Sequence, residues 1–329
     1  MPRAFAAAFA LVVVLTAASA FGEAPPACRG EDLTQVPGLA AARASRQDDF
    51  LNADGLLWRI EKPGVAASYL FGTIHSTDDS ALVVARRAAE QIHGSKVVAT
   101  ELGGPLDAMA KANIGAATLA KALDREHDTF EGVGPKDRLS IEKLVSDQGL
   151  PAEFVHHLKL WFLAILTAMP SCEMKRQALD MPEVDQLLAA TAKNSGVKVI
   201  GLETPAEQLE TFAQIRPDLA ATLLAVAARD KRLSDDVYAT MLRLYRESRP
   251  TEILAIAYIV GDLSDSERAS QDEFTRLLLI GRNAAMAERA EPLLREGGAF
   301  IAVGALHLSG KDGLVARLRA AGYTVSKVW

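Results

Sequence analysis

Cysteine, aromatic residues and blocks of basic charge are all scarce in this sequence of 329 residues. The formal net charge is −6 and no basic block is present, which argues against nucleic acid as the main partner. Aromatic residues make up only 6%, which gives little support to a tetrapyrrole pocket. The motifs His-Glu-x-x-His, Gly-x-Ser-x-Gly and Cys-x-x-Cys are missing, so the best-known zinc-peptidase, serine-hydrolase and redox patterns do not apply.

Long apolar runs are confined to the first residues. Arg3 precedes an uncharged, mostly apolar run, and Ala18-Ser19-Ala20 fits the small-residue rule for signal cleavage. Residues 1–20 are therefore predicted to be a signal peptide cut before Phe21. A retained membrane anchor is the competing interpretation, but the run is short and alanine-rich for a spanning helix. We expect a periplasmic or secreted protein.

Only two cysteines are present, Cys28 and Cys172. In an exported protein an even pair favours a disulfide, with two free thiols as the alternative. The bond would close a long loop and would contribute on the order of 4–5 kcal/mol in the entropic model.

Strand-like runs occur early and late in the chain, with a long helical stretch between them. Residues 21–50 are expected to form an extended lead-in with one short helix, and residues 51–329 a single domain with a helical insert at about 105–295. Helical crossovers between strands favour a mixed central sheet in an α/β or α+β fold. Strands are predicted at 56–60, 68–73, 96–101, 197–201, 300–303 and 323–328, the first two as a hairpin. Helices in the insert are predicted at 105–124, 136–149, 151–169 and 182–195, with later breaks near Pro217, Ser234 and Pro250.

The most informative pattern is one short element written twice. Residues 69–75 read Tyr-Leu-Phe-Gly-Thr-Ile-His, and residues 300–307 read Phe-Ile-Ala-Val-Gly-Ala-Leu-His. Each is an apolar strand, then a glycine that permits close backbone approach, two further residues, and a histidine where the strand ends. His75 and His307 would face one cavity if their strands are neighbours, and they would then form a site for a metal ion or for proton transfer. Core histidines satisfied by backbone carbonyls are the competing interpretation.

Carboxylates follow other predicted strands. Glu101 ends a buried strand, and carboxylates in that position point into the crevice where open sheets bind ligands. A His–Glu–His set suits zinc, manganese or cobalt with an open position for water, whereas a helix cap or surface role is the alternative for Glu101. Glu203 follows residues 197–201 by the same logic, or it caps the next helix. Asp180, with Glu183 and Asp185, lies at a helix start, where acids are expected for dipole reasons.

Arg282 lies in a helix otherwise rich in alanine and charge. It could bind a substrate carboxylate or stabilise an oxyanion, although an arginine on a solvated helix face is the commoner case.

Taken in order, these pieces resemble the TraB/GumN family, which also includes the TIKI proteases. The resemblance covers most of the chain from about Leu57. Its pieces are residues 69–75, Glu101, 178–180 with the helix after them, 199–208, 282–283, 303–310 and 322–325. The family motif has a glycine where this chain has Ala178, a change that concerns backbone freedom rather than a reacting group.

The resemblance implies a fold related to the erythromycin esterase and ChaN-type proteins. It also implies metal-dependent proteolysis, because the TIKI members are similar to this chain at both Gly-x-x-His elements and are described as using manganese or cobalt. Carried across by position, His75, Glu101 and His307 form the core of the site, with Arg282 as a helper.

Three functional hypotheses follow. The leading one is an exported metal-dependent hydrolase, a peptidase, in which His75 and His307 bind a divalent ion (manganese, cobalt or zinc). Glu101 is then the third ligand or the base toward the bound water, and Arg282 stabilises the developing negative charge.

The second hypothesis is a hydrolase without a metal, with His75 as general base and Glu101 orienting it. The third, by fold-level analogy to ChaN-type relatives, is a periplasmic module that binds haem or another ligand. The expected partner is a peptide or small molecule, and a homodimer is also compatible with the sequence.

Overall fold

The computed structural model describes residues 25–104 and 108–329, so the predicted signal peptide lies outside the described residues. Six strands form one mixed sheet in the order β4-β3-β5-β2-β1-β6. Strands β4, β3, β5 and β2 run parallel, whereas β1 is antiparallel to both β2 and β6. The strands are β1 Leu57–Glu61, β2 Ser68–Thr73, β3 Val97–Thr100, β4 Lys198–Gly201, β5 Ala299–Gly304 and β6 Thr324–Lys327.

Helices make up most of the remaining chain. Up to β4 they are α2 Leu39–Ala44, α3 Asp79–Ala89, η1 Ile92–Gly94, α4 Ala108–Ala122, α5 Pro135–Asp147, α6 Ala152–Val155, α7 Leu160–Thr167, α8 Ser171–Ala178 and α9 Val184–Asn194. After β4 they are α10 Pro205–Ala213, α11 Pro217–Ala227, α12 Lys231–Arg246, α13 Glu252–Val260, α14 Asp265–Thr275, the π-helical turn η2 Arg276–Ile280, α15 Gly281–Glu296, η3 Ala305–His307 and α16 Leu314–Ala320. None of the helices in the described part of the chain has the length and apolar character needed to cross a membrane.

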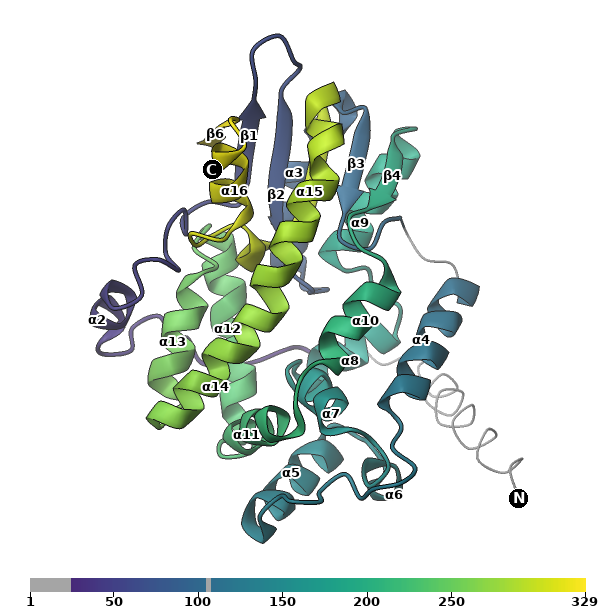
Figure 1. Cartoon of the computed structure of the whole chain (residues 1–329), viewed down its shortest axis with the longest axis vertical. Helices are drawn as coiled ribbons and strands as arrows, with labels where there is room; N and C mark the ends of the chain where they lie inside the picture. The colour runs from purple at the N-terminus through teal and green to yellow at the C-terminus, as the bar shows by residue number, and fades with distance from the viewer. Residues whose placement is uncertain (1–24, 105–107) are drawn as a thin grey trace.

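The sheet is covered on both faces, which gives three layers (Figure 1). On one face α3, α9 and α12 pack against the strands, with Leu188 of α9 in one buried cluster with Phe71 and Phe300. On the other face α15 and α16 pack against β5, with Met286 and Leu318 in one cluster with Ile301. Because the central parallel strands are buried on both sides, β5 is a continuous apolar run rather than an alternating one. The predicted α/β fold with a mixed sheet is confirmed.

A second, wholly helical core lies beyond the carboxyl ends of the parallel strands. It gathers side chains of α5, α7 and α11, among them Ile141, Leu163 and Leu224. In Figure 1 these helices lie below the sheet, and α15 runs from this region up along the sheet before β5 returns. The strand ends therefore meet the helical part of the protein, and this junction contains the candidate site.

Two helix predictions are wrong in detail. The span 151–169 is broken into α6 and α7, because residues 156–159 turn aside to pair with the chain near Leu123: Lys159 N–H donates to Ala122 O at 2.7 Å. The break expected near Ser234 comes earlier, since Asp230 caps α12 by accepting from Arg232 N–H and Ser234 lies inside that helix. The hairpin of β1 and β2 and the remaining strands lie where the sequence predicts them, to within a residue or two.

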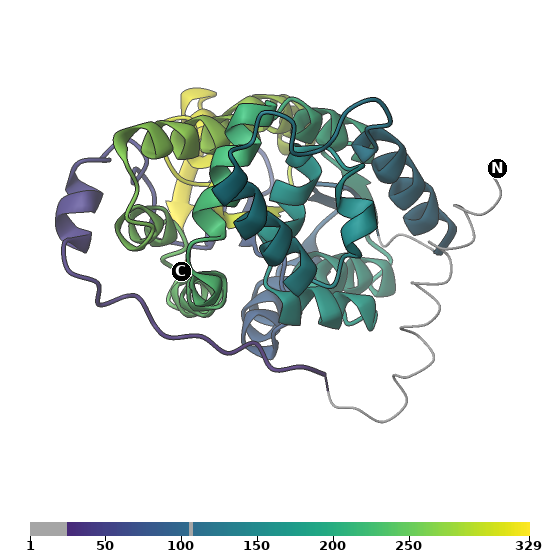
Figure 2. The same ribbon diagram turned by 90° about the horizontal axis from the view of Figure 1, so that it is seen from below.

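Residues 25–50 follow the outside of the helical part and contain the short helix α2 (Figure 2, purple). A disulfide joins Cys28 to Cys172 at the start of α8, with the two Cα atoms 5.3 Å apart and 144 positions between them in the sequence. Leu33 N–H donates to the Thr240 hydroxyl of α12 at 2.9 Å, and Arg43 pairs with Glu252 of α13 at 2.7 Å. The lead-in is thus fastened to three helices that are distant in sequence.

Candidate active site

The parallel strands deliver the candidate residues to one edge of the sheet. Thr73 of β2 pairs with Gly304 of β5, so His75 and His307 leave neighbouring strands at the same level. Glu101 follows β3, on the other side of β5, and Glu203 follows β4. The close packing of η3 on β2 requires glycine at position 72, because a Cβ there would lie 2.9 Å from Ala305 Cα.

A buried arginine joins the two carboxylates. The Arg282 side chain extends from α15, and its Nη2 donates to Glu101 Oε2 at 2.6 Å and to Glu203 Oε2 at 2.7 Å. Its Nε donates to Glu203 at 3.0 Å and its Nη1 to Leu278 O at 3.2 Å. All three side chains are buried, so these are desolvated, charge-assisted hydrogen bonds. Arg282 therefore acts in this geometry as the counter-ion of Glu101 and Glu203.

Glu101 is held as an anion by its neighbours. Its Oε1 accepts from Gly304 N–H at 2.6 Å, in addition to the Arg282 contact at Oε2. Burial alone would raise the pKa of Glu101, but the charges of His75 and Arg282 and the Gly304 hydrogen bond outweigh it and lower that pKa to about 2. At neutral pH Glu101 is ionised, with Arg282 as its cationic partner in direct contact.

His307 is a buried neutral imidazole whose tautomer is fixed. Asn283 Nδ2 donates to Asp312 O at 3.0 Å, so Asn283 Oδ1 faces His307 Nδ1. His307 Nδ1–H donates a hydrogen bond to this oxygen at 2.6 Å. The lone pair of His307 Nε2 is then left facing Glu101 Oε1 at 3.7 Å. Burial lowers the pKa of His307 to about 4, against the opposing pull of Glu101.

This environment makes stability fall in mild acid. A histidine in the unfolded chain, with a pKa near 6.5, binds protons that the buried His307 does not. The contribution of His307 to the free energy of unfolding is therefore complete above pH 6.5 and is lost as the pH falls toward 4. Between pH 7 and pH 5 we expect wild type to lose about 2 kcal/mol more than His307→Gln, measured by urea unfolding at each pH. Parallel pH profiles for the two proteins would contradict the buried neutral ring.

His75 lies in a different setting, at a cavity of about 260 Å³ lined also by Glu101, Glu183 and Asp185. Its ring is 59% exposed, and its Nδ1 lies 3.6 Å from Glu183 Oε2 and 3.6 Å from Asp185 Oδ2. Hydrogen bonding to Glu183 and the charges of Asp185 and Glu101 raise the pKa of His75 above its usual value. The site thus contains one histidine kept neutral and one that favours its proton.

Among the described residues, Asp185 has one carboxylate oxygen that is hydrogen-bonded and one that is not. Its Oδ1 accepts from the Thr73 hydroxyl at 3.0 Å, but its Oδ2 is buried and has no hydrogen-bond partner in the described structure. Burial raises the pKa of Asp185 to about 6. Glu183 and Asp185 read from sequence as ordinary acids at the start of α9. The contact that brings them to the site, Val184 N–H to Ser76 O at 3.2 Å, is a tertiary one.

Of the remaining predicted residues, some belong to the site and others lie outside it. Glu203 belongs to the buried cluster, whereas Asp180 lies outside it, with its side chain 83% exposed and paired with Lys111. Arg282 lines a separate cavity of about 590 Å³ behind Glu203 rather than the one at His75. Direct contact between Arg282 and a substrate held at His75 is therefore not part of this geometry.

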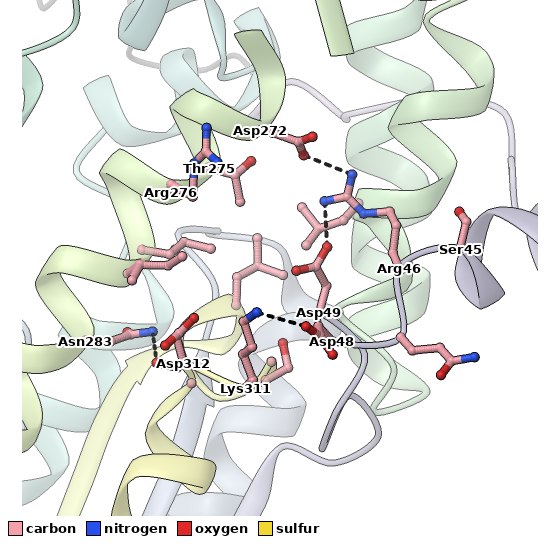
Figure 3. A pocket seen from close by; sticks show the side chains of 18 of the residues that line it. Ser45, Arg46, Asp48, Asp49, Asp272, Thr275, Arg276, Asn283, Lys311 and Asp312 are labelled. Carbon is pink, nitrogen blue, oxygen red and sulfur yellow. Dashed lines mark hydrogen bonds and ion pairs between the residues drawn. The ribbon is translucent and has the colours of Figure 1, made fainter. Parts of the chain in front are cut away.

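Another cavity, of about 650 Å³, lies between the lead-in, η2 and the loop after η3 (Figure 3). Many of its charged side chains are paired: Arg46 bridges Asp49 and Asp272, and Lys311 pairs with Asp48. Asn283 forms part of its wall, so this cavity adjoins the back of His307 rather than the face toward Glu101.

The predicted metal ligands are divided between two contacts. Glu101 and His307 face each other, whereas His75 faces Glu183 and Asp185. Across residues 25–104 and 108–329, no three or more His, Cys, Asp or Glu side chains are grouped so that they could hold a metal ion. The three predicted ligands therefore do not form a ready-made coordination site.

Fold and site together define an α/β protein in which parallel strands bring two histidines and two glutamates, backed by a buried arginine, to one edge of a mixed sheet. The model of the TraB/PrgY/gumN family matches residues 56–327, and the chain belongs to this family. The resemblance noted in the sequence is confirmed. A search of curated proteins returned no match to the chain.

Proposed function

We propose that the chain is an exported hydrolase that cleaves peptides with the help of a divalent cation in the cavity at His75. The observation that carries this proposal is the gathering of three carboxylates around one exposed imidazole, at the carboxyl ends of parallel strands. Open α/β sheets bind their ligands at that edge.

The cation part of the proposal rests on charge and donor chemistry rather than on a ready-made geometry. Glu101, Glu183 and Asp185 line one small cavity, and Asp185 Oδ2 is buried there without a partner. The field that raises the pKa of His75 is also the field that attracts a divalent ion. Oxygen-rich donor sets favour manganese over softer metals. His75, Glu183 and Asp185, with Glu101 beside them, are the residues that would hold it. The cation would supply a Lewis acid that makes water nucleophilic near neutral pH.

The chain's own groups have separate tasks in this proposal. Glu183 and Asp185, which would hold the cation, also orient the His75 ring, because each has a carboxylate oxygen 3.6 Å from His75 Nδ1. Glu101, fixed by Arg282 and Gly304 N–H, stays ionised and supplies a constant negative charge at the cavity wall. His307, neutral and held by Asn283, places its Nε2 3.7 Å from Glu101 Oε1.

The His75–Asp185 contact also favours a second candidate, a hydrolase that needs no cation. In it the carboxylates orient the ring through Nδ1, and His75 in its neutral form, which its raised pKa makes the minor form at neutral pH, takes a proton from water at Nε2. Glu183 and Asp185 would replace Glu101 as the orienting groups. The disulfide between Cys28 and Cys172 supports the export shared by both candidates, because such bonds persist in oxidising compartments.

One experiment separates the two candidates. Hydrolysis of fluorescently labelled casein is measured before chelation, after exhaustive treatment with EDTA, and after addition of Mn²⁺, Co²⁺ or Zn²⁺. The proposal expects activity to disappear on chelation and to return with Mn²⁺ or Co²⁺. Activity that survives chelation removes the cation and leaves the second candidate. No casein hydrolysis under any of these conditions overturns the peptidase.

The role of His75 has a matched control in the chain. His75→Ala is expected to lower kcat/KM on labelled casein by about 10²–10⁴-fold, because it removes the imidazole between cavity and carboxylates. His127 is equally exposed, at 61%, and also lies near an aspartate, Asp124, but outside the site. His127→Ala should leave the rate unchanged. Equal losses in the two variants, or none in His75→Ala, would remove His75 from the reaction.

A further inference from the structure

A buried hydrogen-bond network lies directly behind His75 and comes from the helical part of the protein. Glu173 of α8 is wholly buried, and its Oε1 accepts from Thr77 N–H at 2.8 Å. Its Oε2 accepts from the Tyr238 hydroxyl at 2.6 Å and from the Thr77 hydroxyl at 3.2 Å. Thr77 and Tyr238 are neutral donors, and their hydrogen bonds occupy both oxygens of the buried Glu173 carboxylate.

The network continues through the next residue toward His75. The Ser76 and Tyr238 hydroxyls lie 2.7 Å apart, and Ser76 Oγ accepts from Asp78 N–H at 3.0 Å. Burial and the nearby Glu173 hold the pKa of Tyr238 well above its usual range, so its hydroxyl keeps a proton to donate. Ser76, Thr77 and Asp78, the three residues that follow His75, are therefore all fixed by this network.

The opposite side of the same loop carries the carboxylates that face His75. Ser76 O accepts from Val184 N–H at 3.2 Å, and Val184 stands between Glu183 and Asp185. The loop thus connects Glu173 on one side with the start of α9 on the other. A shift at Glu173 would change the 3.6 Å contacts that His75 Nδ1 makes with both acids.

We infer that Glu173 and Tyr238 are positioning residues, which set the place of His75 relative to Glu183 and Asp185 and so link the helical part of the protein to the site. Neither residue is among those that line the cavity at His75, and the hydrogen bonds described above go to Ser76 and Thr77. Buried polar networks of this kind rigidify what they hold when every member is satisfied. Only the kinetic test of this inference rests on the proposed hydrolase function.

Two tyrosines provide a matched pair for the test. Tyr238→Phe and Tyr258→Phe each delete a phenol hydroxyl that donates to a carboxylate, buried at Glu173 in one case and partly exposed at Asp272 in the other. On labelled casein we expect Tyr238→Phe to lower kcat at least tenfold with KM within twofold, and Tyr258→Phe to leave both unchanged. Glu173→Gln, which keeps an oxygen for Thr77 N–H, should retain more of kcat than Glu173→Leu. Equal kcat losses in the two tyrosine variants would overturn the inference.

A second measurement stands apart from catalysis. Hydrogen exchange at the amides of Thr77 and Asp78 should be at least tenfold faster in Glu173→Leu than in wild type, while Tyr258→Phe leaves it unchanged. Unchanged exchange in Glu173→Leu overturns the network even if casein is hydrolysed. If wild type does not hydrolyse casein, the proposed function fails, and the exchange result alone decides the network.

Discussion

Replacing Arg282 by methionine should destabilise the protein by about 3–5 kcal/mol, because the substitution leaves two carboxylates buried without a cation. Glu101 and Glu203 are 4% and 7% exposed, and in the structure both bind the same guanidinium nitrogen. Methionine restores the length and apolar stem of the side chain but none of its charge. The measurement is urea unfolding at pH 7, with the midpoint and slope fitted separately.

Arg289, about two turns after Arg282 in α15, provides the control. It pairs with Glu207 at the protein surface, where both side chains are more than 40% exposed, so Arg289→Met should cost at most about 1 kcal/mol. Combining Arg282→Met with Glu203→Gln removes one of the two stranded charges and should restore part of the loss. If Arg282→Met is as mild as Arg289→Met, the buried cluster does not carry the energy assigned to it.

The strand-end residues could be predicted from sequence because their position is encoded locally. An apolar run that ends in Gly-x-x-His marks both where the strand stops and which residue follows it, and His75 and His307 occupy those places. Glu101 and Glu203 follow buried strands in the same way. Parallel pairing of β2, β3, β4 and β5 then brings the four residues to one edge of the sheet. The position of these residues at the strand ends is therefore encoded in the local sequence.

The partners of these residues could not be predicted, since long-range packing selects them. Sequence gave no reason to separate the two histidines, yet Asn283 and burial keep one neutral while Glu183 and Asp185 favour the proton on the other. Asp180 and Asp185 both read as acids at a helix start. Tertiary hydrogen bonds, from Val184 to the loop after His75 and from Thr73 to Asp185, hold Asp185 at the cavity, whereas Asp180 points to solvent.

Removing the disulfide should have an effect as large as losing Arg282, but through the unfolded chain. Cys28→Ser with Cys172→Ser opens a loop of 144 positions, which costs about 5 kcal/mol in the entropic model. That is comparable to the whole stability of a marginal domain, so a substantial unfolded fraction is expected at 37 °C. Because the unfolded ensemble becomes less restricted, the urea slope of the double variant should also be steeper than that of the oxidised wild type.

The disulfide could stabilise the protein by restricting the unfolded chain or by holding the lead-in in place in the folded state. A non-covalent contact of the same lead-in segment separates these two explanations. Asp32 pairs with Arg243 of α12 at a partly exposed position, so Asp32→Ser loosens the segment in the folded state without changing the covalent loop. We expect a loss of at most about 1 kcal/mol for Asp32→Ser and an unchanged urea slope. A loss below 1 kcal/mol in the double cysteine variant, with the slope of wild type, would mean that the lead-in is held by its polar contacts and that the bond to α8 adds little. A large loss with an unchanged slope would instead place the effect in the folded state, where Cys172 precedes the buried Glu173 that holds the loop of His75.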